Sequence, residues 1–310
     1  MPSLSASSAS SPCRIFSADR GGVGAEIVPP RNIISGCCGA VGETMAKRDG
    51  KAGIRPMQTI VINNRKGGVG KTMLATHLAW FLAEDDARVL FIDLDAQGNG
   101  SRTLAAAGRG GRSSDLFDPD AKIELTGAPG LTVLESDETL DIVQLQDVQQ
   151  MVKAFNAFPP LFDYCVIDTP PTWGALNFAA LTVADHLVAP IEMKDYALDG
   201  VEQLLKTIQA AEQSGRGGRK INFLGLLPSR FNSHSPREKE NVAEIVRTIG
   251  TSMVFNGLLA QRDGYEEAVS QGVPVWTLKK RAAMVAGQEM RFVLSQIRDR
   301  MDGLPAKEIV

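Results

Sequence analysis

The chain has 310 residues, of which 44% are hydrophobic and 22% are charged, as in ordinary globular proteins with a sizeable core. Its formal net charge of −3 excludes a generic polyanion-binding protein, so contact with nucleic acid would require a local basic patch. The four cysteines have no metal-ligand spacing, and a reducing, cytoplasmic setting fits them best. No apolar run is long enough to span a bilayer.

Residues 1–56 differ in composition from the rest of the chain. They are rich in Ser, Ala and Gly and show no sustained helical or strand period, which predicts a disordered tail. No apolar stretch follows a basic start, as a secretory signal would require, and acidic residues argue against an organelle transit peptide. Met45 and Met57 precede the first apolar run, so a later start of translation remains an alternative.

Residues 57–310 form one predicted domain in which strands and helices alternate. In chain order the predicted elements are strand 57–63, helix 72–84, strand 88–94, loop 108–119, strand 131–135, helix 141–156, strand 162–168, helix 175–184, strand 186–191, helix 197–213, strand 220–227, helix 237–249, strand 254–259, and helices 264–271 and 283–301. This rhythm predicts an α/β fold with one doubly wound, mostly parallel sheet. Ligands then bind at the carboxyl ends of the strands.

A glycine-rich segment follows the first strand and reads Lys66-Gly-Gly-Val-Gly-Lys-Thr72. In a phosphate-binding loop the glycines let backbone N–H groups surround a phosphate chain, and a lysine followed by Ser or Thr completes the site. The following helix directs its N-terminus at the phosphates. Lys66 is an additional lysine, badly placed for the phosphates of its own site and better placed to reach a nucleotide in a facing subunit. The candidate nucleotide-binding residues are Lys66, Gly67, Gly68, Val69, Gly70, Lys71, Thr72, Met73 and Arg230.

Three aspartates stand near the ends of two later strands. Asp93 and Asp95 close strand 88–94, and because residues i and i+2 of a strand share a face, they can hold Mg²⁺ through water or orient an attacking water. Asp168 ends strand 162–168 and suits the magnesium shell of a nucleotide. Each aspartate alone could equally form a turn. Their order behind the glycine-rich loop favours a single nucleoside triphosphate site.

At these residues the chain resembles the ParA/MinD family of deviant Walker-A P-loop ATPases, in its ParA- or Soj-like partition branch. The resemblance rests on Lys66–Thr72, on Asp93-Leu-Asp-Ala-Gln-Gly-Asn99 and on Val166-Ile-Asp-Thr-Pro-Pro171. It implies a homodimer that sandwiches ATP and Mg²⁺, with Lys66 contacting the phosphates of the other subunit. The implied catalytic residues are Lys66, Lys71 and Asp95, where Asp95 positions the water, and the implied metal residues are Thr72, Asp93 and Asp168.

The same resemblance implies partners. The ATP-bound dimer would bind DNA without sequence preference, in a cytoplasmic, nucleoid-associated setting, and a ParB-type centromere-binding adaptor would stimulate hydrolysis and release it. The candidate DNA-binding residues are Arg262, Lys279, Lys280 and Arg281. A solvated surface is the alternative interpretation of each basic residue.

Two other functions share the same ATPase chemistry. A MinD-like division-site regulator cycles on membranes and needs a C-terminal amphipathic helix. Residues 288–301 have an apolar face, but the polar ending 302–308 favours packing of this face against the sheet, so no membrane partner is expected. A ParA-like positioner of a protein cargo differs only in its partner. The iron-protein branch is excluded because Cys165 is the only cysteine of the predicted domain.

Overall fold

The computed structural model describes residues 56–194 and 197–304. The predicted disordered tail, residues 1–56, lies almost entirely outside the described residues, so that prediction stays untested.

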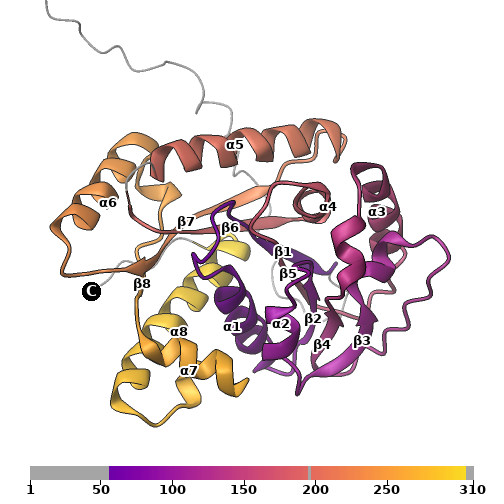
Figure 1. Ribbon diagram of the computed structural model, residues 1–310, viewed down its shortest axis with the longest axis horizontal. Helices are drawn as coiled ribbons and strands as arrows, with labels where there is room; N and C mark the ends of the chain where they lie inside the picture. The colour runs from indigo at the N-terminus through magenta and orange to yellow at the C-terminus, as the bar shows by residue number, and fades with distance from the viewer. Residues whose placement is uncertain (1–55, 195–196, 305–310) are drawn as a thin grey trace, which may run out of the picture. The chain divides into compact units, whose positions relative to one another are not determined.

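Eight parallel strands form a single sheet with the order β3-β4-β2-β5-β1-β6-β7-β8 (Figure 1). The strands are β1 Gln58–Ile62, β2 Arg88–Asp93, β3 Gly108–Arg112, β4 Gly130–Glu135, β5 Tyr164–Asp168, β6 His186–Ile191, β7 Asn222–Phe231 and β8 Leu259–Ala260. The central strands are almost wholly apolar, as expected for parallel strands covered on both faces.

Helices cover both faces of the sheet. They are α1 Lys71–Ala83, α2 Asn99–Thr103, α3 Val148–Asn156, α4 Ala175–Val183, α5 Ala197–Ser214, α6 Pro236–Ile249, α7 Asp263–Gln271 and α8 Arg281–Met301. Short 3₁₀ turns lie at η1 Ser113–Phe117, η2 Glu138–Ile142, η3 Leu145–Asp147, η4 Thr251–Met253 and η5 Val275–Thr277.

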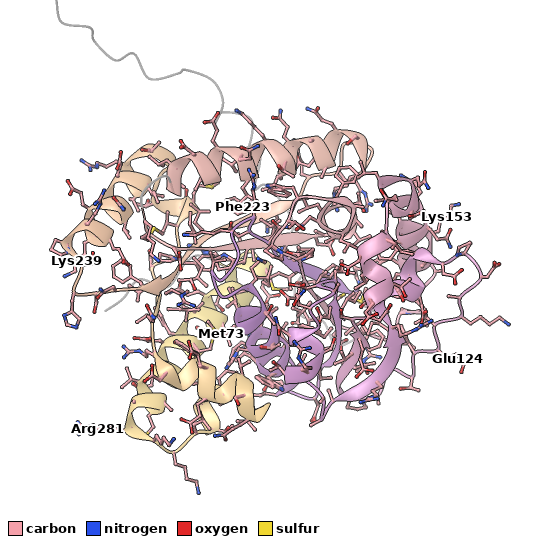
Figure 2. All side chains as sticks on the ribbon, in the orientation of Figure 1. Met73, Glu124, Lys153, Phe223, Lys239 and Arg281 are labelled. Atoms are coloured by element: carbon pink, nitrogen blue, oxygen red, sulfur yellow. The ribbon has the colours of Figure 1, made fainter. Side chains whose placement is uncertain are left out.

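Alternate residues of the strands build two separate cores. Val61 packs into one core with apolar residues of α3, α4, α5 and α6, while Ile60 and Ile62 pack into the other with α1, α7 and α8. Charged side chains such as Lys153, Lys239 and Arg281 point outward from the helices (Figure 2). The predicted doubly wound, parallel α/β fold is therefore confirmed.

Three of the predicted elements were wrong in part. The segment 108–119, predicted as a loop, contains edge strand β3 and the 3₁₀ turn η1. The strand predicted at 254–259 is reduced to β8, with one isolated bridge at Val254. The helix predicted at 141–156 begins only at Val148, after two 3₁₀ turns. The short helix α2 was not predicted.

Candidate nucleotide-binding site

The three sequence motifs meet at one edge of the sheet. Strands β2, β5 and β1 are neighbours, and Asp168 pairs with both Ile62 and Asp93 in the strand register. The glycine-rich loop follows β1 and leads into α1, while Asp93 and Asp168 are the last residues of β2 and β5. This is the carboxyl edge, where parallel α/β sheets bind their ligands.

The loop adopts a backbone that requires glycine. Gly68 and Gly70 have φ angles of +74° and +89°, a left-handed conformation that other residues rarely adopt. Gly70 is the N-cap of α1, and a Cβ on it would lie 3.2 Å from Ser229 Oγ. The first N–H groups of α1 and the positive end of its dipole therefore face the loop, as in an anion-binding site.

Lys71 occupies the interior of the loop. Its side chain is buried, and its Nζ donates a hydrogen bond to the carbonyl oxygen of Lys66 at 3.2 Å. Burial lowers the pKa of Lys71, while the charges of Asp168 and Asp95 act in the opposite direction. Lys71 is thus a buried cation within electrostatic reach of both carboxylates.

Asp168 has a carboxylate oxygen with no protein partner. Its Oδ1 accepts a hydrogen bond from the backbone N–H of Thr169 at 3.1 Å, whereas its buried Oδ2 accepts none. Burial, together with the nearby charge of Asp93, raises the pKa of Asp168 well above its usual range, and the Thr72 hydroxyl and the charge of Lys71 oppose this. A free carboxylate oxygen near a threonine hydroxyl fits Mg²⁺, which binds through one or two protein oxygens, water and phosphate oxygens.

Asp93 and Asp95 differ in their surroundings. Asp93 is fully buried, and its Oδ2 accepts hydrogen bonds from the backbone N–H and the hydroxyl of Ser101, each at 2.7 Å. Its Oδ1 accepts the N–H of Asp95 at 3.1 Å. Asp95 is half-buried, and its Oδ1 accepts the N–H of Gln97 at 3.0 Å. Both oxygens of Asp93 therefore hold the loop that carries Asp95.

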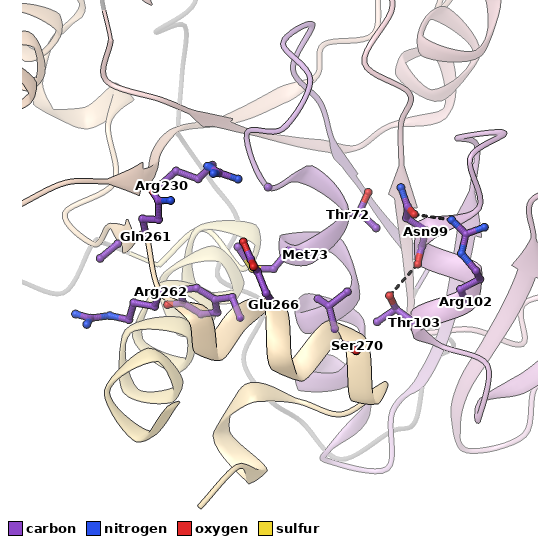
Figure 3. A pocket seen from close by; sticks show the side chains of 14 residues that line it. Thr72, Met73, Asn99, Arg102, Thr103, Arg230, Gln261, Arg262, Glu266 and Ser270 are labelled. Atoms are coloured by element: carbon purple, nitrogen blue, oxygen red, sulfur yellow. Dashed lines mark hydrogen bonds between the residues drawn. The ribbon is translucent and has the colours of Figure 1, made fainter. Parts of the chain in front are cut away.

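A cavity of about 460 Å³ opens beside the loop (Figure 3). Its walls include Gly70, Thr72 and Met73 on one side and Arg230 with Gln261 on the other. The volume lies within the usual range for small-molecule sites. The structure thus brings the predicted residues Met73 and Arg230 to a single cavity that continues from the phosphate loop.

Arg230 holds an unusual backbone conformation. Its φ of +52° is rare for a residue with a side chain, and its Nη1 donates to the carbonyl oxygen of Gly68 at 3.4 Å. Such conformations persist where the surrounding structure enforces them, often at ligand sites.

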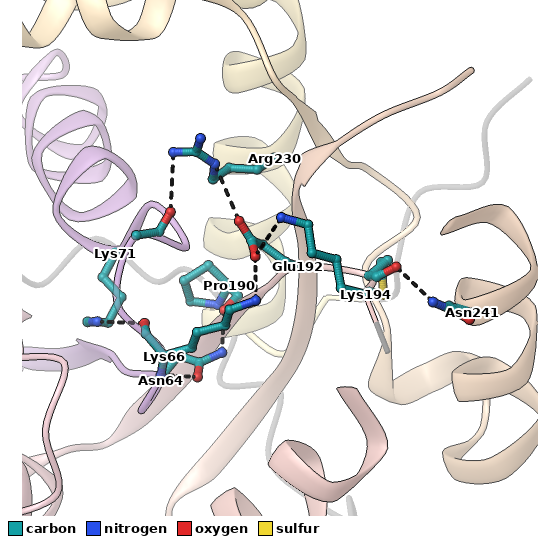
Figure 4. Close-up of polar contacts among 10 residues, drawn as sticks. Asn64, Lys66, Lys71, Pro190, Glu192, Lys194, Arg230 and Asn241 are labelled. Atoms are coloured by element: carbon teal, nitrogen blue, oxygen red, sulfur yellow. Dashed lines mark hydrogen bonds and ion pairs between the residues drawn. The ribbon is translucent and has the colours of Figure 1, made fainter. Parts of the chain in front are cut away.

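Lys66 points to a different partner from that of Lys71 (Figure 4). Its Nζ lies 2.5 Å from Oε2 of Glu192, the residue that follows β6, and its side chain remains 54% exposed. Lys194 Nζ and Arg230 Nε lie 3.3 Å and 3.4 Å from the same buried carboxylate. Burial would raise the pKa of Glu192, but the hydrogen bonds from Lys66 and Lys194 outweigh it and hold this pKa below its ordinary value.

Comparison with known proteins identifies the family. A protein-family model described as an AAA domain matches residues 57–221. Protein IncC of Escherichia coli is 34% identical over 274 residues, which cover 84% of this chain and 74% of that protein. The chromosome partitioning protein ParA of Caulobacter vibrioides is 31% identical, over 79% of this chain and 97% of that protein. The chain belongs to the ParA family of partition ATPases.

Solved structures share the fold of this ParA-family ATPase. A variant of McdA from Cyanothece in complex with ATP matches with a TM-score of 0.66 and 24% identity, over 82% of this chain and 98% of that one. Cobyrinic acid a,c-diamide synthase from Mycobacterium smegmatis, with bound ADP and magnesium, matches with a TM-score of 0.61 and 22% identity, over 82% and 100% of the two chains. The ParA-family chain is therefore a P-loop NTPase in fold as well as in sequence.

The four candidate DNA-binding residues of this ParA-family protein differ in their contacts, and Arg262 also lines the cavity beside the phosphate loop. The guanidinium of Arg262 donates two hydrogen bonds to Glu289, at 2.8 and 2.5 Å. Lys280 Nζ lies 2.8 Å from Oε1 of Glu267. Lys279 and Arg281 are exposed. Two of the four predicted cations are thus already paired within the subunit.

Helix α8 packs as the sequence predicts. Its apolar residues Met290, Val293 and Ile297 are buried in the core beneath the sheet. Within the described part of the chain, no helix has the length and apolar character to cross a bilayer. Packing therefore explains most of the apolar face of α8, whereas Phe292 is 36% exposed.

Sequence reasoning missed three polar residues of this site: Glu192, Ser101 and Ser136. Glu192 directly follows β6, the neighbour of β1, so the rule that ligands gather at carboxyl ends of strands could have identified it. Ser136 likewise follows β4. Ser101 lies in the unpredicted helix α2 and gave no such signal.

Proposed function

We propose that this ParA-family protein hydrolyses ATP to ADP and phosphate with Mg²⁺ and uses the reaction to partition a plasmid or chromosome. Its ATP-bound form is a homodimer that binds DNA without sequence preference. A ParB-type centromere-binding adaptor stimulates hydrolysis and releases the dimer from DNA. The names of the relatives support partition as the process.

The position of Lys66 carries the dimer part of this proposal. Lys71 fills the interior of the loop, whereas the Lys66 side chain is half-exposed and its Nζ lies against Glu192. A second lysine on the surface of a phosphate loop adds nothing to its own phosphates but can neutralise those of a facing subunit. Transfer of a phosphoryl group depends on such charge neutralisation.

The other residues of the site have separate roles in Mg²⁺ binding, nucleotide binding and hydrolysis. Thr72 and Asp168 would hold Mg²⁺, because the Thr72 hydroxyl lies close to the Asp168 carboxylate, whose Oδ2 is buried without a hydrogen-bond partner. Lys71 would contact the β- and γ-phosphates, and the cavity lined by Met73 and Arg230 would take the base and sugar. Asp95 would orient the attacking water, and Asp93 would support the magnesium shell mainly by holding Asp95 in place.

One experiment with three variants tests this division of roles. Lys71→Ala should abolish nucleotide binding. Lys66→Ala should bind ATP but neither dimerise nor hydrolyse it, and Asp95→Ala should bind ATP and accumulate as a dimer. Nucleotide affinity, molar mass by light scattering, and ATP turnover in the presence of DNA and the ParB-type adaptor measure the three steps.

Lys194→Ala provides the matched control for Lys66→Ala. Lys194 also pairs with Glu192 and is comparably exposed, at 60%, but it lies outside the loop. It should dimerise and hydrolyse ATP like the parent protein. If Lys66→Ala dimerises with ATP as well as the parent does, the proposed sandwich dimer is wrong.

A further inference from the structure

The loop that carries Asp95 is tied to the neighbouring strand β4. Ser136, the first residue after β4, donates a hydrogen bond from its Oγ to the carbonyl oxygen of Asp95 at 2.6 Å. On the other side of the same residue, the N–H of Asp95 donates to Asp93 Oδ1. The peptide groups before and after the Asp95 Cα are therefore both fixed.

Ser101 closes these contacts into a ring. Its Oγ donates to Asp93 Oδ2 at 2.7 Å and accepts the backbone N–H of Ser136 at 2.9 Å. Every hydroxyl in the ring donates once, so the donor and acceptor directions are mutually consistent. The ring joins the carboxyl ends of β2 and β4, which are paired strands.

On its N–H side, the Asp95 loop is held to the sheet by Asp93 and by the Leu94 N–H, which donates to the carbonyl oxygen of Asp168 at 3.1 Å. On its carbonyl side, Ser136 is the contact that ties the loop to β4. The other bonds to the carbonyl and carboxylate of Asp95 come from Gly98 and Gln97, which belong to the same loop and move with it. Without the Ser136 hydroxyl, the carbonyl side of Asp95 would be held only by that loop. The direction of a short side chain follows its backbone, so the Asp95 carboxylate would lose its fixed position.

We propose that Ser136 is a positioning residue for ATP hydrolysis, which acts by fixing the backbone of Asp95. This inference rests on the proposed function, in which Asp95 orients the attacking water. Ser136 is not among the residues that line the 460 Å³ cavity, in which the base and sugar are expected, and its hydroxyl is bonded to the backbone of Asp95. Its effect should therefore fall on the chemical step and not on binding.

Ser136→Ala should lower the single-turnover rate of ATP hydrolysis by about tenfold, because small displacements of a catalytic group carry penalties of this size. The affinity for ATP should change by less than about twofold, since the phosphate loop is untouched. Ser136→Thr retains a hydroxyl and should restore most of the rate. Single-turnover hydrolysis and nucleotide titration with Mg²⁺ and DNA measure both quantities.

Ser113→Ala is the matched control for a purely structural effect. Ser113 is a buried serine whose Oγ donates to the carbonyl oxygen of Leu134 at 2.9 Å, also on β4, but it has no contact with Asp95. This variant should lose stability without losing the hydrolysis rate. Thermal unfolding of all three variants separates stability from catalysis.

The outcomes distinguish this inference from the proposed function. A parent protein that does not hydrolyse ATP would overturn both. An active parent with an equally active Ser136→Ala variant would overturn the positioning role alone. The positioning role would also be overturned if Ser113→Ala lost the same hydrolysis rate, or if Ser136→Thr did not restore the rate.

Discussion

His77 is buried between α1 and η5, where the rings of Trp80 and Trp276 lie near it. Its Nδ1 donates to the carbonyl oxygen of Met73 at 2.7 Å, and its Nε2 accepts the N–H of Val275 at 3.2 Å. Only the neutral imidazole can donate at one nitrogen and accept at the other. Burial lowers the pKa of His77 to about 4, although the hydrogen bond to Met73 opposes this.

This residue predicts a loss of stability in mild acid. The folded-state pKa lies below the unfolded value, so the unfolded chain binds a proton first and stability falls as pH decreases from about 6.5 to about 4. The full effect of His77 amounts to about 3 kcal/mol. Urea unfolding at pH 7.5 and pH 5 should show it, and His77→Gln should reduce the difference between the two pH values. An unchanged difference in this variant would assign the pH dependence to other groups.

Single residues of the site were predictable where they belong to a contiguous motif. The positions of Lys71, Asp95 and Asp168 at one sheet edge follow from their place after apolar strands. Glu192 and Ser136 depend instead on pairing between distant strands, because Glu192 meets Lys66 only when β6 lies beside β1. The order of strands in the sheet cannot be deduced from the local periodicity of the sequence.

At the scale of elements, α8 is held close to η5 by a glycine. A Cβ on Gly287 would lie 2.9 Å from the Cα of Trp276, a backbone atom that cannot swing away. Trp276 also donates its indole N–H to Glu84 Oε1 at 2.8 Å, and the Arg291 guanidinium stacks 4.8 Å from its ring centre. The Trp276 side chain of η5 thus contacts Arg291 of α8 and Glu84, the residue that caps the end of α1.

Gly287→Ala should therefore destabilise the fold by about 1–3 kcal/mol, as overpacking of a close contact does. Gly200→Ala is the control, because Gly200 is an exposed residue of α5 with nothing within 4 Å of an added Cβ. It should be neutral or stabilising by up to about 1 kcal/mol, since alanine favours the helix. Chemical denaturation of both variants tests the pair, and equal effects would contradict the role of the close contact.

Strand β3 shows why one element could not be read from the sequence. Its residues, Gly108–Arg112, have the composition of a loop and pair only with β4 at the edge of the sheet. A Cβ on Gly110 would lie 2.9 Å from the side chains of Leu125 and Thr132. The strand thus depends on close approach by neighbours, which no local pattern reveals, whereas the apolar central strands were predicted within a few residues.

At the scale of the whole molecule, the net charge of −3 opposes binding to DNA, so the proposed interaction requires a local basic surface. Arg262 and Lys280 are engaged with Glu289 and Glu267. The exposed Lys279 and Arg281, at the start of α8, are the better candidates for phosphate contacts.

The affinity of the ATP-bound protein for DNA should fall steeply with salt. Lys279→Ala combined with Arg281→Ala should weaken binding for all sequences and reduce the slope of log affinity against log salt by about 2. Lys153→Ala combined with Lys239→Ala removes the same charge from exposed positions on α3 and α6, well separated from Arg281 in Figure 2. Fluorescence anisotropy over a salt series compares the pairs. Equal losses in both pairs would indicate a general charge effect.

The all-parallel sheet also has a consequence for biosynthesis. β1 is synthesised before its partner strands β5 and β6. The pairing of Gln58 with Tyr164 and of Ile60 with His186 can therefore form only after more than 100 further residues have been made. Pairing between such distant segments closes long loops and is slow. Until about residue 168 has been made, the apolar strand before the phosphate loop lacks both of these partners. Rapid translation of the first half should therefore favour aggregation over assembly.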